Sequence, residues 1–245
     1  MMTLKRCWVV AKKDMLVYYA RGPVLIFGIF FPACLFFAFA LGRGLPPESL
    51  APGLIGMSLF FAGSAVTPAV MPFETRTRTI ERLVASPVTM GMILAGDCIA
   101  ALLFGLFVSA LPLAGSLYLI GASPANPWLL VVAILLSATC YSIMGALFSA
   151  HPTDNPSGVM TISNLVRLPM IFFSGVFIPV AALPTWGRAL AAISPLTYTT
   201  ELLRASLQGG NYFDPGLCVA MLALFCLVLW PVTVAAHKWA FPRRL

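Results

Sequence analysis

The chain has 245 residues, of which 60% are apolar and only 9% charged, and its formal net charge is +7. Soluble proteins carry about 25% charged residues, so this composition excludes an ordinary soluble enzyme and indicates a membrane protein. The length holds six spans and short connections but no further catalytic domain, so we expect one all-α membrane domain over residues 1–245. The positive charge fits membrane topology, and no nucleic-acid partner is expected.

Residues 1–21 have the pattern of an amphipathic helix. Apolar side chains recur at helical spacing at Leu4, Cys7, Trp8, Ala11, Met15 and Tyr18. Basic side chains occupy another sector at Lys5, Arg6, Lys12 and Lys13. This pattern predicts a helix in the membrane interface, with its cations toward anionic lipid headgroups. A plain extension of the first span is the alternative, because Val9, Val10, Leu16 and Val17 interrupt the polar sector.

Apolar runs then predict six transmembrane helices, since about 20 apolar residues cross the hydrocarbon core and a helix satisfies its own backbone there. We place them at residues 23–42, 51–72, 91–119, 127–149, 158–178 and 216–236. Eleven Lys and Arg residues flank the span ends on one side and three those on the other. The positive-inside rule therefore predicts a protein of the cytoplasmic (inner) membrane with its N-terminus and its tail, residues 237–245, in the cytoplasm.

Charge is concentrated between the second and third spans, in residues 73–89. This stretch carries Glu74, Arg76, Arg78, Glu81 and Arg82. Ile80, Leu83 and Val84 follow one another at the spacing of a short amphipathic helix that would end before Pro87. One interpretation is a docking helix for a cytoplasmic partner, and the other is a solvated loop that simply obeys the positive-inside rule.

Residues 179–215, on the outer side, are too polar for two more spans and too apolar for a free loop. Helical spacing is present at Leu183, Trp186, Leu190 and Ile193. This predicts one or two short helices that dip into the outer leaflet, packed on protein or lining a wet cavity. A helix resting on the membrane surface is the alternative.

The sequence lacks a P-loop, an HExxH motif and a GxSxG motif, and its six cysteines have no metal-binding spacing. We therefore expect no catalytic residue, no metal and no cofactor bound by this chain, and no ATP hydrolysis by the chain alone. Only Asp97 and Arg167 are ionisable groups clearly inside predicted spans. An ion-coupled carrier or channel would need several, and an intramembrane enzyme would need a nucleophile and a base, so both are weaker alternatives.

Arg167 needs a polar environment because a charge in mid-bilayer is costly. It could hydrogen-bond the Leu165 carbonyl, whose helical donor is removed by Pro169, or pair with Asp97. A buried anchor between helices and a polar substrate pathway are further alternatives.

Residues 172–204 carry a series of short motifs after the fifth span. They are Ser174-Gly175, Pro179, Leu183-Pro184-x-Trp186, Ser194-Pro195-Leu196-x-Tyr198 and Leu203-Arg204. A second series, Thr79 to Leu83 with Ser86-Pro87, follows the second span. Together with the six-span count and the amphipathic start, these motifs resemble the ABC-2 type exporter permeases, a family that includes drug-resistance and nodulation-type permeases. Ser194 stands where Asn is commoner in the family.

The resemblance implies half of a transporter. Two permease copies, as a homodimer, would surround a pathway, and two copies of a separate ATP-binding subunit, which holds ATP and Mg, would dock beneath. The resemblance assigns coupling to the ATPase to Glu74, Thr75, Arg76, Arg78, Glu81, Arg82, Lys12 and Lys13. It assigns an outer gate to Ser174, Gly175, Pro179, Pro184, Trp186, Pro195 and Tyr198.

The same resemblance implies outward transport by alternating access, powered by the partner ATPase. Eighteen phenylalanines favour a hydrophobic or amphipathic cargo, such as a drug, a lipid or a glycolipid. Aromatic rings also suit sugar rings, so a polysaccharide or glycan exporter is the alternative. Membrane lipids surround the chain, and lipid-linked cargo would enter sideways between protomers.

Overall fold

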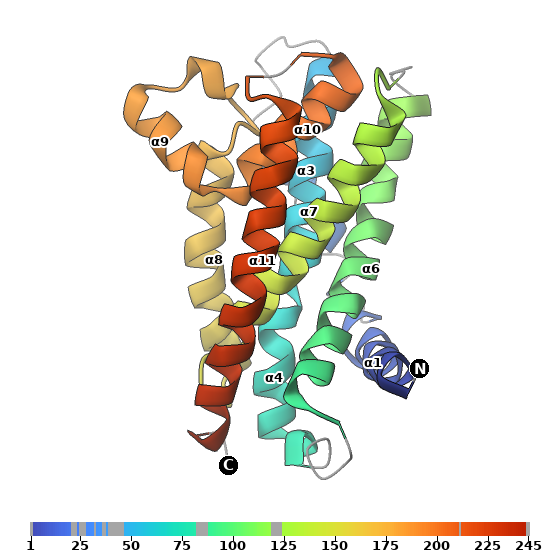
Figure 1. Cartoon of the computed structure of the whole chain (residues 1–245), viewed down its shortest axis with the longest axis vertical. Coiled ribbons are helices and arrows are strands. Elements are labelled where there is room, and N and C mark those ends of the chain that lie inside the picture. The colour runs from blue at the N-terminus through green and yellow to red at the C-terminus, as the bar shows by residue number, and fades with distance from the viewer. Residues whose placement is uncertain are drawn as a thin grey trace.

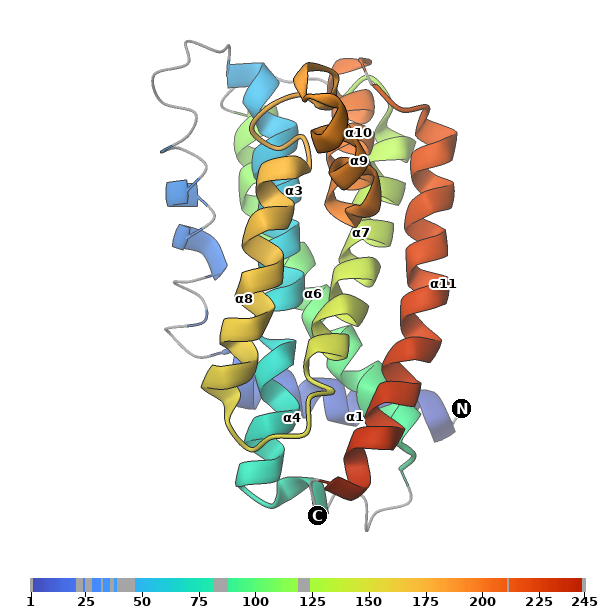
Figure 2. The same ribbon diagram turned by 90° about the vertical axis from the view of Figure 1, so that its left-hand side faces the viewer.

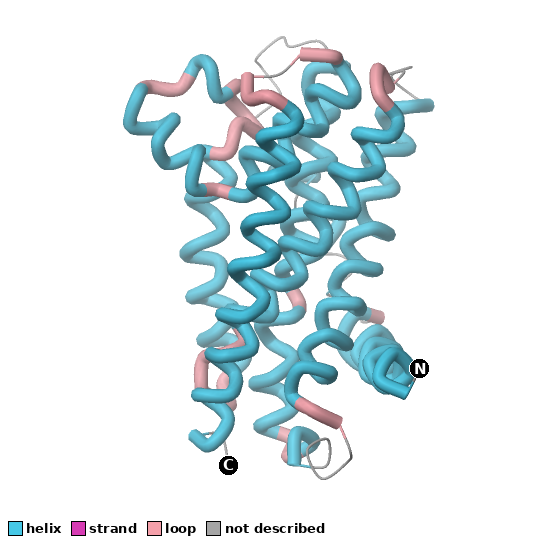
Figure 3. The backbone as a smooth tube through the Cα atoms, viewed as in Figure 1, coloured by secondary structure: helices cyan, strands magenta, loops and turns pink. Residues whose placement is uncertain are grey.

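A computed structural model describes residues 2–20, 24, 28–31, 33–35, 38, 47–81, 88–118, 124–210 and 212–243. Within these ranges the chain forms helices joined by short loops and contains no strand (Figure 3). The long helices run side by side along the long axis of the molecule (Figure 1). The predicted all-α architecture is therefore confirmed for this part of the chain.

Helix α1 (Met2–Asp14) lies across the lower part of the bundle, roughly perpendicular to the long helices (Figure 2). It continues into a π-helical turn, η1 (Met15–Tyr19). The end of α11 lies at the same lower end of the molecule as α1 (Figure 1). A crosswise helix at one end is the arrangement expected of an interfacial helix, and its place in a membrane stays a prediction.

The second predicted span is one bent helix rather than a straight one that ends at residue 72. Helix α3 (Pro47–Ala65) passes into α4 (Thr67–Arg76) with a break at Val66. Pro68 lies in the first turn of α4, where proline is tolerated, but it has no N–H to donate to the Ser64 carbonyl of α3 and its ring crowds that carbonyl, so α3 cannot continue unbroken into α4. The helix continues through Arg76, so Glu74, Thr75 and Arg76 end a long helix instead of beginning a separate loop.

Four helices in the described ranges are long and apolar enough to cross a membrane: Ser49–Arg76, α6 (Met90–Tyr118), α7 (Pro127–Phe148) and α11 (Pro215–Ala240). Their bounds agree closely with the third, fourth and sixth predicted spans, apart from four extra residues at the end of α11. The first predicted span, residues 23–42, lies largely outside the described residues. The count of six spans therefore stays a prediction.

The fifth predicted span corresponds to α8 (Pro156–Phe173), which ends five residues earlier than predicted. Gly175 ends it with a φ of 80°, in the left-handed region that glycine enters without steric cost. A Cβ at this position would lie 2.9 Å from Val180 Cγ2, so the turn is also too crowded for another residue. The chain therefore turns at Gly175 and does not continue as a span to residue 178.

Beyond this turn come a short 3-10 turn, η2 (Val180–Ala182), and two helices, α9 (Thr185–Ile193) and α10 (Pro195–Gln208). Helix α10 is buried among α3, α7 and α11, whereas α9 projects from the upper end (Figure 1). The one or two short helices predicted after the fifth span are therefore present, and one of them packs inside the bundle. Their depth in the outer leaflet stays a prediction.

The core is centred on α3, α7 and α10. Phe60 and Tyr141 pack edge to face with their ring centroids 5.1 Å apart. The Tyr141 hydroxyl donates to Thr199 Oγ1 at 2.6 Å, and Ser137 Oγ lies 2.7 Å from the same atom. These three buried hydroxyls satisfy one another, which a polar group removed from water requires.

Candidate functional site

The predicted coupling residues gather at the lower end of the molecule, where α1 crosses α4 and α6. The contact is close because Gly96 of α6 faces α1. A Cβ at Gly96 would lie 2.6 Å from Val10 Cβ and 2.9 Å from the Cys7 carbonyl oxygen, shorter than any ordinary contact. Glycine at this position therefore allows the two helix backbones to touch.

The face of α1 that packs on the protein differs from the predicted apolar stripe. Its buried side chains are Cys7, Val10, Ala11 and Asp14. Leu4 and Trp8, which belong to the stripe, are exposed. The prediction that Val10 only interrupts a polar sector is wrong, because the groove beside Gly96 accepts that side chain. The exposed Leu4 and Trp8 remain available to a membrane interface.

Lys13 joins α1 to α4 through a buried ionic cluster. Its Nζ lies 2.9 Å from Asp14 Oδ1 and donates a hydrogen bond to Glu74 Oε1. Both carboxylates are fully buried, whereas the Lys13 side chain is 26% exposed. Asp97, on α6, is also buried close to Asp14, and its carboxyl oxygens accept no hydrogen bond from the described residues.

The ammonium of Lys13 is held in its charged form. Burial alone would lower its pKa, but the carboxylates of Asp14 and Glu74 raise the pKa above its ordinary value of 10.5. Lys13 therefore stays protonated at neutral pH. Beside it, burial and the charge of Glu74 raise the pKa of Tyr18 to about 12, so this phenol stays neutral.

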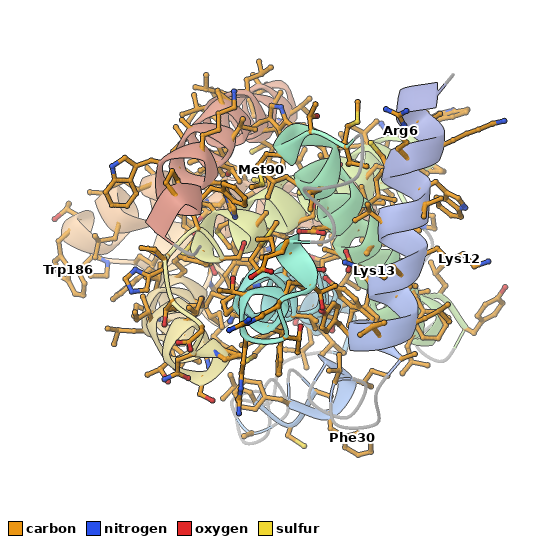
Figure 4. All side chains as sticks on the ribbon, turned by 90° about the horizontal axis from the view of Figure 1, so that it is seen from below. Arg6, Lys12, Lys13, Phe30, Met90 and Trp186 are labelled. Carbon is orange, nitrogen blue, oxygen red and sulfur yellow. The ribbon has the colours of Figure 1, made fainter. Side chains whose placement is uncertain are left out.

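The predicted coupling residues divide into two groups. Glu74 and Lys13 pair inside the chain, and Thr75 Oγ1 donates to the Met71 carbonyl. The exposed members are Lys12, Arg76, Arg78 and Glu81. Viewed from below, Lys13 points from α1 toward the bundle and Lys12 points away (Figure 4). Arg82 lies outside the described residues, as do Leu83 and Val84 of the predicted amphipathic helix.

Lys13→Met is expected to destabilise the chain by about 1–3 kcal/mol, because it leaves two buried carboxylates without this cation. This is below the cost of leaving a permanently charged group buried, because a buried carboxylate that loses its cation can take up a proton. In thermal unfolding of the detergent-solubilised protein, the midpoint should fall by roughly 2–12 °C. The adjacent Lys12→Met is the matched control and should leave the midpoint unchanged. Equal shifts in the two variants would contradict an internal role for Lys13.

The outer segment begins at the turn after α8. Ser174 is buried, and its carbonyl accepts a 2.7 Å hydrogen bond from Thr200 Oγ1. The Gly175 carbonyl accepts a hydrogen bond from Arg204 Nη2 at 3.2 Å. The predicted Ser-Gly pair is thus fastened to α10 by two side chains that lie 26 and 29 residues away.

Glu201 is a buried carboxylate of α10 that the sequence analysis did not single out. Its Oε1 accepts from Arg204 Nη1 at 2.6 Å, and its Oε2 accepts from the Tyr212 backbone N–H at 2.5 Å. The pair therefore connects α10 to the loop before α11, and Arg204 extends the connection to Gly175. A Glu and an Arg three residues apart in an otherwise apolar segment are the sequence signal that could have identified it.

Tyr198 and Pro195 of the predicted gate are buried in the same helix. The Tyr198 hydroxyl donates to the Ala192 carbonyl at 2.7 Å, and its ring packs against Phe213 and Phe225. The hydrogen bond joins α10 back to the end of α9.

The remaining predicted gate residues lie on the outside. Pro179 and Pro184 are exposed and precede η2 and α9, respectively. Trp186 is exposed at the edge of the molecule, with its ring 5.8 Å from that of Phe173 (Figure 4). The predicted gate thus has a buried part on α10 and an exposed part on α9.

Asp97 and Arg167 belong to different sites. Asp97 lies in the cluster with Asp14, and no ion pair between Asp97 and Arg167 is present in the described part of the chain. Arg167 Nε donates to the Ser163 carbonyl at 3.3 Å rather than to that of Leu165. The proposed pairing with Asp97 is therefore wrong. Within the described ranges, no group of three His, Cys, Asp or Glu side chains has the arrangement of a metal site.

The sequence is similar to those of known membrane permeases. The inner membrane transport permease YadH of Escherichia coli is 29% identical over 188 residues, which cover 75% of this chain and 73% of YadH. The probable multidrug ABC transporter permease YbhR of Escherichia coli is 24% identical over 208 residues, 80% of this chain and 52% of YbhR. Nodulation protein J of Rhizobium leguminosarum bv. viciae is 23% identical over 219 residues, 81% of each chain.

A family model described as ABC-2 type transporter matches residues 5–207. The match includes α1, the end of α4, and the outer segment through α10, so it covers both groups of candidate residues. It confirms the resemblance drawn from the sequence motifs. Together with the apolar helices and the similarity to inner membrane permeases, it indicates a multi-pass membrane protein that is a permease and not itself an ATPase. The chain belongs to the ABC-2 type transporter permease family.

Proposed function

We propose that this chain is the membrane-spanning subunit of an ATP-driven exporter, in which two copies surround the pathway and two ATPase subunits dock at the lower end. The observation that carries the proposal is the exposed charged surface at the end of α4, formed by Arg76, Arg78 and Glu81, with Lys12 exposed on the side of α1 that faces away from the bundle (Figure 4). It lies where α1 and α4 are tied together by Lys13 and Glu74. A partner that pushes on this surface would therefore move α1 and α4 as one unit.

The bent helix α3–α4 offers a route from this end to the outer segment. A Cβ at Gly56 would lie 3.2 Å from Thr200 Cγ2, so α3 and α10 are in close contact near the outer end. Gly56 and Arg76 are 20 residues apart, a length of about 30 Å along a helix. Movement of α4 would thus reach α10 and the Gly175 turn, which supports alternating access between the two ends.

The cargo we propose is hydrophobic or amphipathic and moves outward. The names of two relatives support this class: YbhR is a probable multidrug permease, and DrrB1 of Streptomyces coeruleorubidus is a daunorubicin resistance permease, 24% identical over 86 residues. A panel of drugs, lipids and glycolipids that stimulate ATP hydrolysis by the assembled transporter would identify the class. Stimulation by free polar solutes alone would overturn it.

The coupling surface is tested by Arg76→Glu together with Arg78→Glu. Charge reversal places like charges where an acidic partner surface is expected, so binding of the ATPase should weaken at least about tenfold, or about 1.4 kcal/mol. The measurement is co-purification with any ATPase that is encoded beside this gene, followed by ATP-driven uptake of cargo into inverted vesicles, which corresponds to export from the cell.

Thr185→Glu is the matched control for this test. Thr185 is exposed on α9, which lies at the upper end of the molecule (Figure 1), so the added carboxylate is at the opposite end from the proposed surface. It should leave ATPase binding unchanged. Export by the double variant at the wild-type rate, or export by the isolated chain without ATPase, would refute the assignment.

A further inference from the structure

A cavity of about 520 Å³ lies beside α8. Its walls come from α8, α3 and α6, and from the described residues Val24, Gly28 and Phe31 of the first predicted span. This volume is in the range of sites that hold small organic molecules. Phe31 and Leu168, which line it, are each 37% exposed, so the cavity communicates with the surroundings of the chain.

Arg167 lies in the wall of this cavity with its charge uncompensated by any described residue. The side chain is 1% exposed, its Nε donates to the Ser163 carbonyl, and its Nη2 has no hydrogen-bond partner in the described part of the chain. The ion pairs of the described residues do not include it. A buried cation without an anion is costly, and an anion placed against its Nη2 would relieve that cost.

The cavity is polar on one wall and aromatic on the other. The polar wall is a row of α8 side chains spaced three or four residues apart, Ser157, Thr161, Asn164 and Arg167. The facing wall carries the rings of Phe31, Phe61 and Phe104. Such a cavity suits a molecule with a charged head and an apolar body.

The head is expected at Arg167 rather than at the start of α8. The Asn155 side chain already accepts hydrogen bonds from the N–H groups of Ser157 and Gly158, so the helix N-terminus has its own cap. Arg167 lies ten residues from Ser157, about 15 Å along the helix. The two ends of the polar row therefore differ: the start of α8 has its cap, and Arg167 keeps a buried donor without a partner in the described part of the chain.

We infer that this cavity binds an amphiphile with an anionic head, a phosphate or a carboxylate, that pairs with Arg167 while its apolar part packs on the three phenylalanines. Such an amphiphile would be a cargo class of the proposed exporter, and its transport, unlike its binding, rests on that proposed function. A resident anionic lipid and a single-chain anionic cargo share this chemistry.

The test is binding of radiolabelled dodecyl phosphate to the purified chain in phosphatidylcholine nanodiscs, without ATP or ATPase. Arg167→Gln should raise the Kd at least about tenfold, and Arg167→Lys should retain most of the affinity because the charge is kept. Dodecanol, which lacks the anion, should bind more weakly to the wild type and equally to wild type and Arg167→Gln. Dodecyl phosphate binding that is unchanged by Arg167→Gln would overturn the inference.

A second variant tests the site in case Arg167→Gln fails to fold. Asn164→Glu places a carboxylate one turn from Arg167 on the same wall, where it should pair with the guanidinium and block dodecyl phosphate without lowering the thermal midpoint. Asn164→Gln is its matched control and should bind normally. Retained binding in Asn164→Glu would count against the site.

Two competition experiments distinguish a resident anionic lipid from a single-chain anionic cargo as the bound molecule. Competition by phosphatidylglycerol in the nanodisc would identify a lipid occupant, and displacement only by soluble alkyl phosphates would identify a cargo. Inorganic phosphate alone should not compete. Since binding is measured without nucleotide, its failure would leave the exporter proposal intact, and failure of ATP-driven export would leave a demonstrated site standing.

Discussion

Gly96→Val is expected to displace α1 from α6 and to abolish coupled transport. Even a single Cβ at this position would overlap Val10 and the Cys7 carbonyl, and the helix backbones cannot absorb the clash without separating. Overpacking of this kind costs about 1–3 kcal/mol. Cys7, which is buried in this contact, should become accessible. Its labelling by N-ethylmaleimide, measured by mass spectrometry of the peptides, should rise roughly tenfold or more.

Gly91 supplies the control on the same helix. Nothing lies within 4 Å of a Cβ at Gly91, so Gly91→Val should leave Cys7 protected and transport normal. If Gly96→Val kept Cys7 protected, α1 would not be held by this contact. Labelling in both variants alike would point to a general loss of helix α6 instead.

Glu201→Leu is expected to unfold the outer segment first. It removes the anion that Arg204 pairs with and the acceptor of the Tyr212 N–H, and breaking a buried pair from one side costs about 3–5 kcal/mol. The thermal midpoint in detergent should fall by roughly 6–20 °C. Proteolysis should begin between α8 and α11, where the segment loses its connections to Gly175 and Tyr212.

The double variant Glu201→Leu with Arg204→Leu separates the effect of an unpaired charge on stability from the effect of the lost contacts. It leaves no unpaired ion, so it should be more stable than Glu201→Leu alone, although below wild type. Glu81→Gln, at an exposed position, should not move the midpoint. A double variant that is less stable than the single would show that packing, not charge, dominates at Glu201.

The long helices could be predicted from the sequence because bilayer thickness imposes their length and composition. Helices α6 and α7 begin and end within one residue of the predicted bounds. The end of α8 could not be predicted as well, because the apolar run continues past Gly175 while the backbone turns there. Hydropathy indicates which residues can contact lipid, but it gives no information on the backbone torsion angles at Gly175.

The ionic cluster could not be predicted, because its partners are far apart in sequence and only packing brings them together. Lys13 and Glu74 are 61 residues apart and meet only because α1 settles on Gly96. Both residues were singled out, but as surface contacts for a partner. The burial of Asp14 could not be predicted from its position in the sequence, because a charged residue at the end of an amphipathic helix normally faces water.

The outer segment was predicted in outline from its prolines and helical spacing. The sequence could not decide between insertion and surface attachment, because both patterns are amphipathic. The position of α10 buries Glu201, where Arg204 pairs with its charge and the Tyr212 N–H donates a hydrogen bond to it. The polar row on α8 can be identified from the sequence as well, because Ser157, Thr161, Asn164 and Arg167 are spaced so that they share one helical face.

The crosswise position of α1 has a consequence for the order in which the chain folds during its synthesis. Its first dozen residues leave the ribosome before any of the groups that receive them, and Glu74 and Gly96 are synthesised many residues later. Until α6 has been made, this segment has no Gly96 contact to enter, and its exposed apolar and basic side chains suit the membrane interface predicted for it. Helix α1 is thus translated before α4 and α6 but can reach its final position only after both of them have been made.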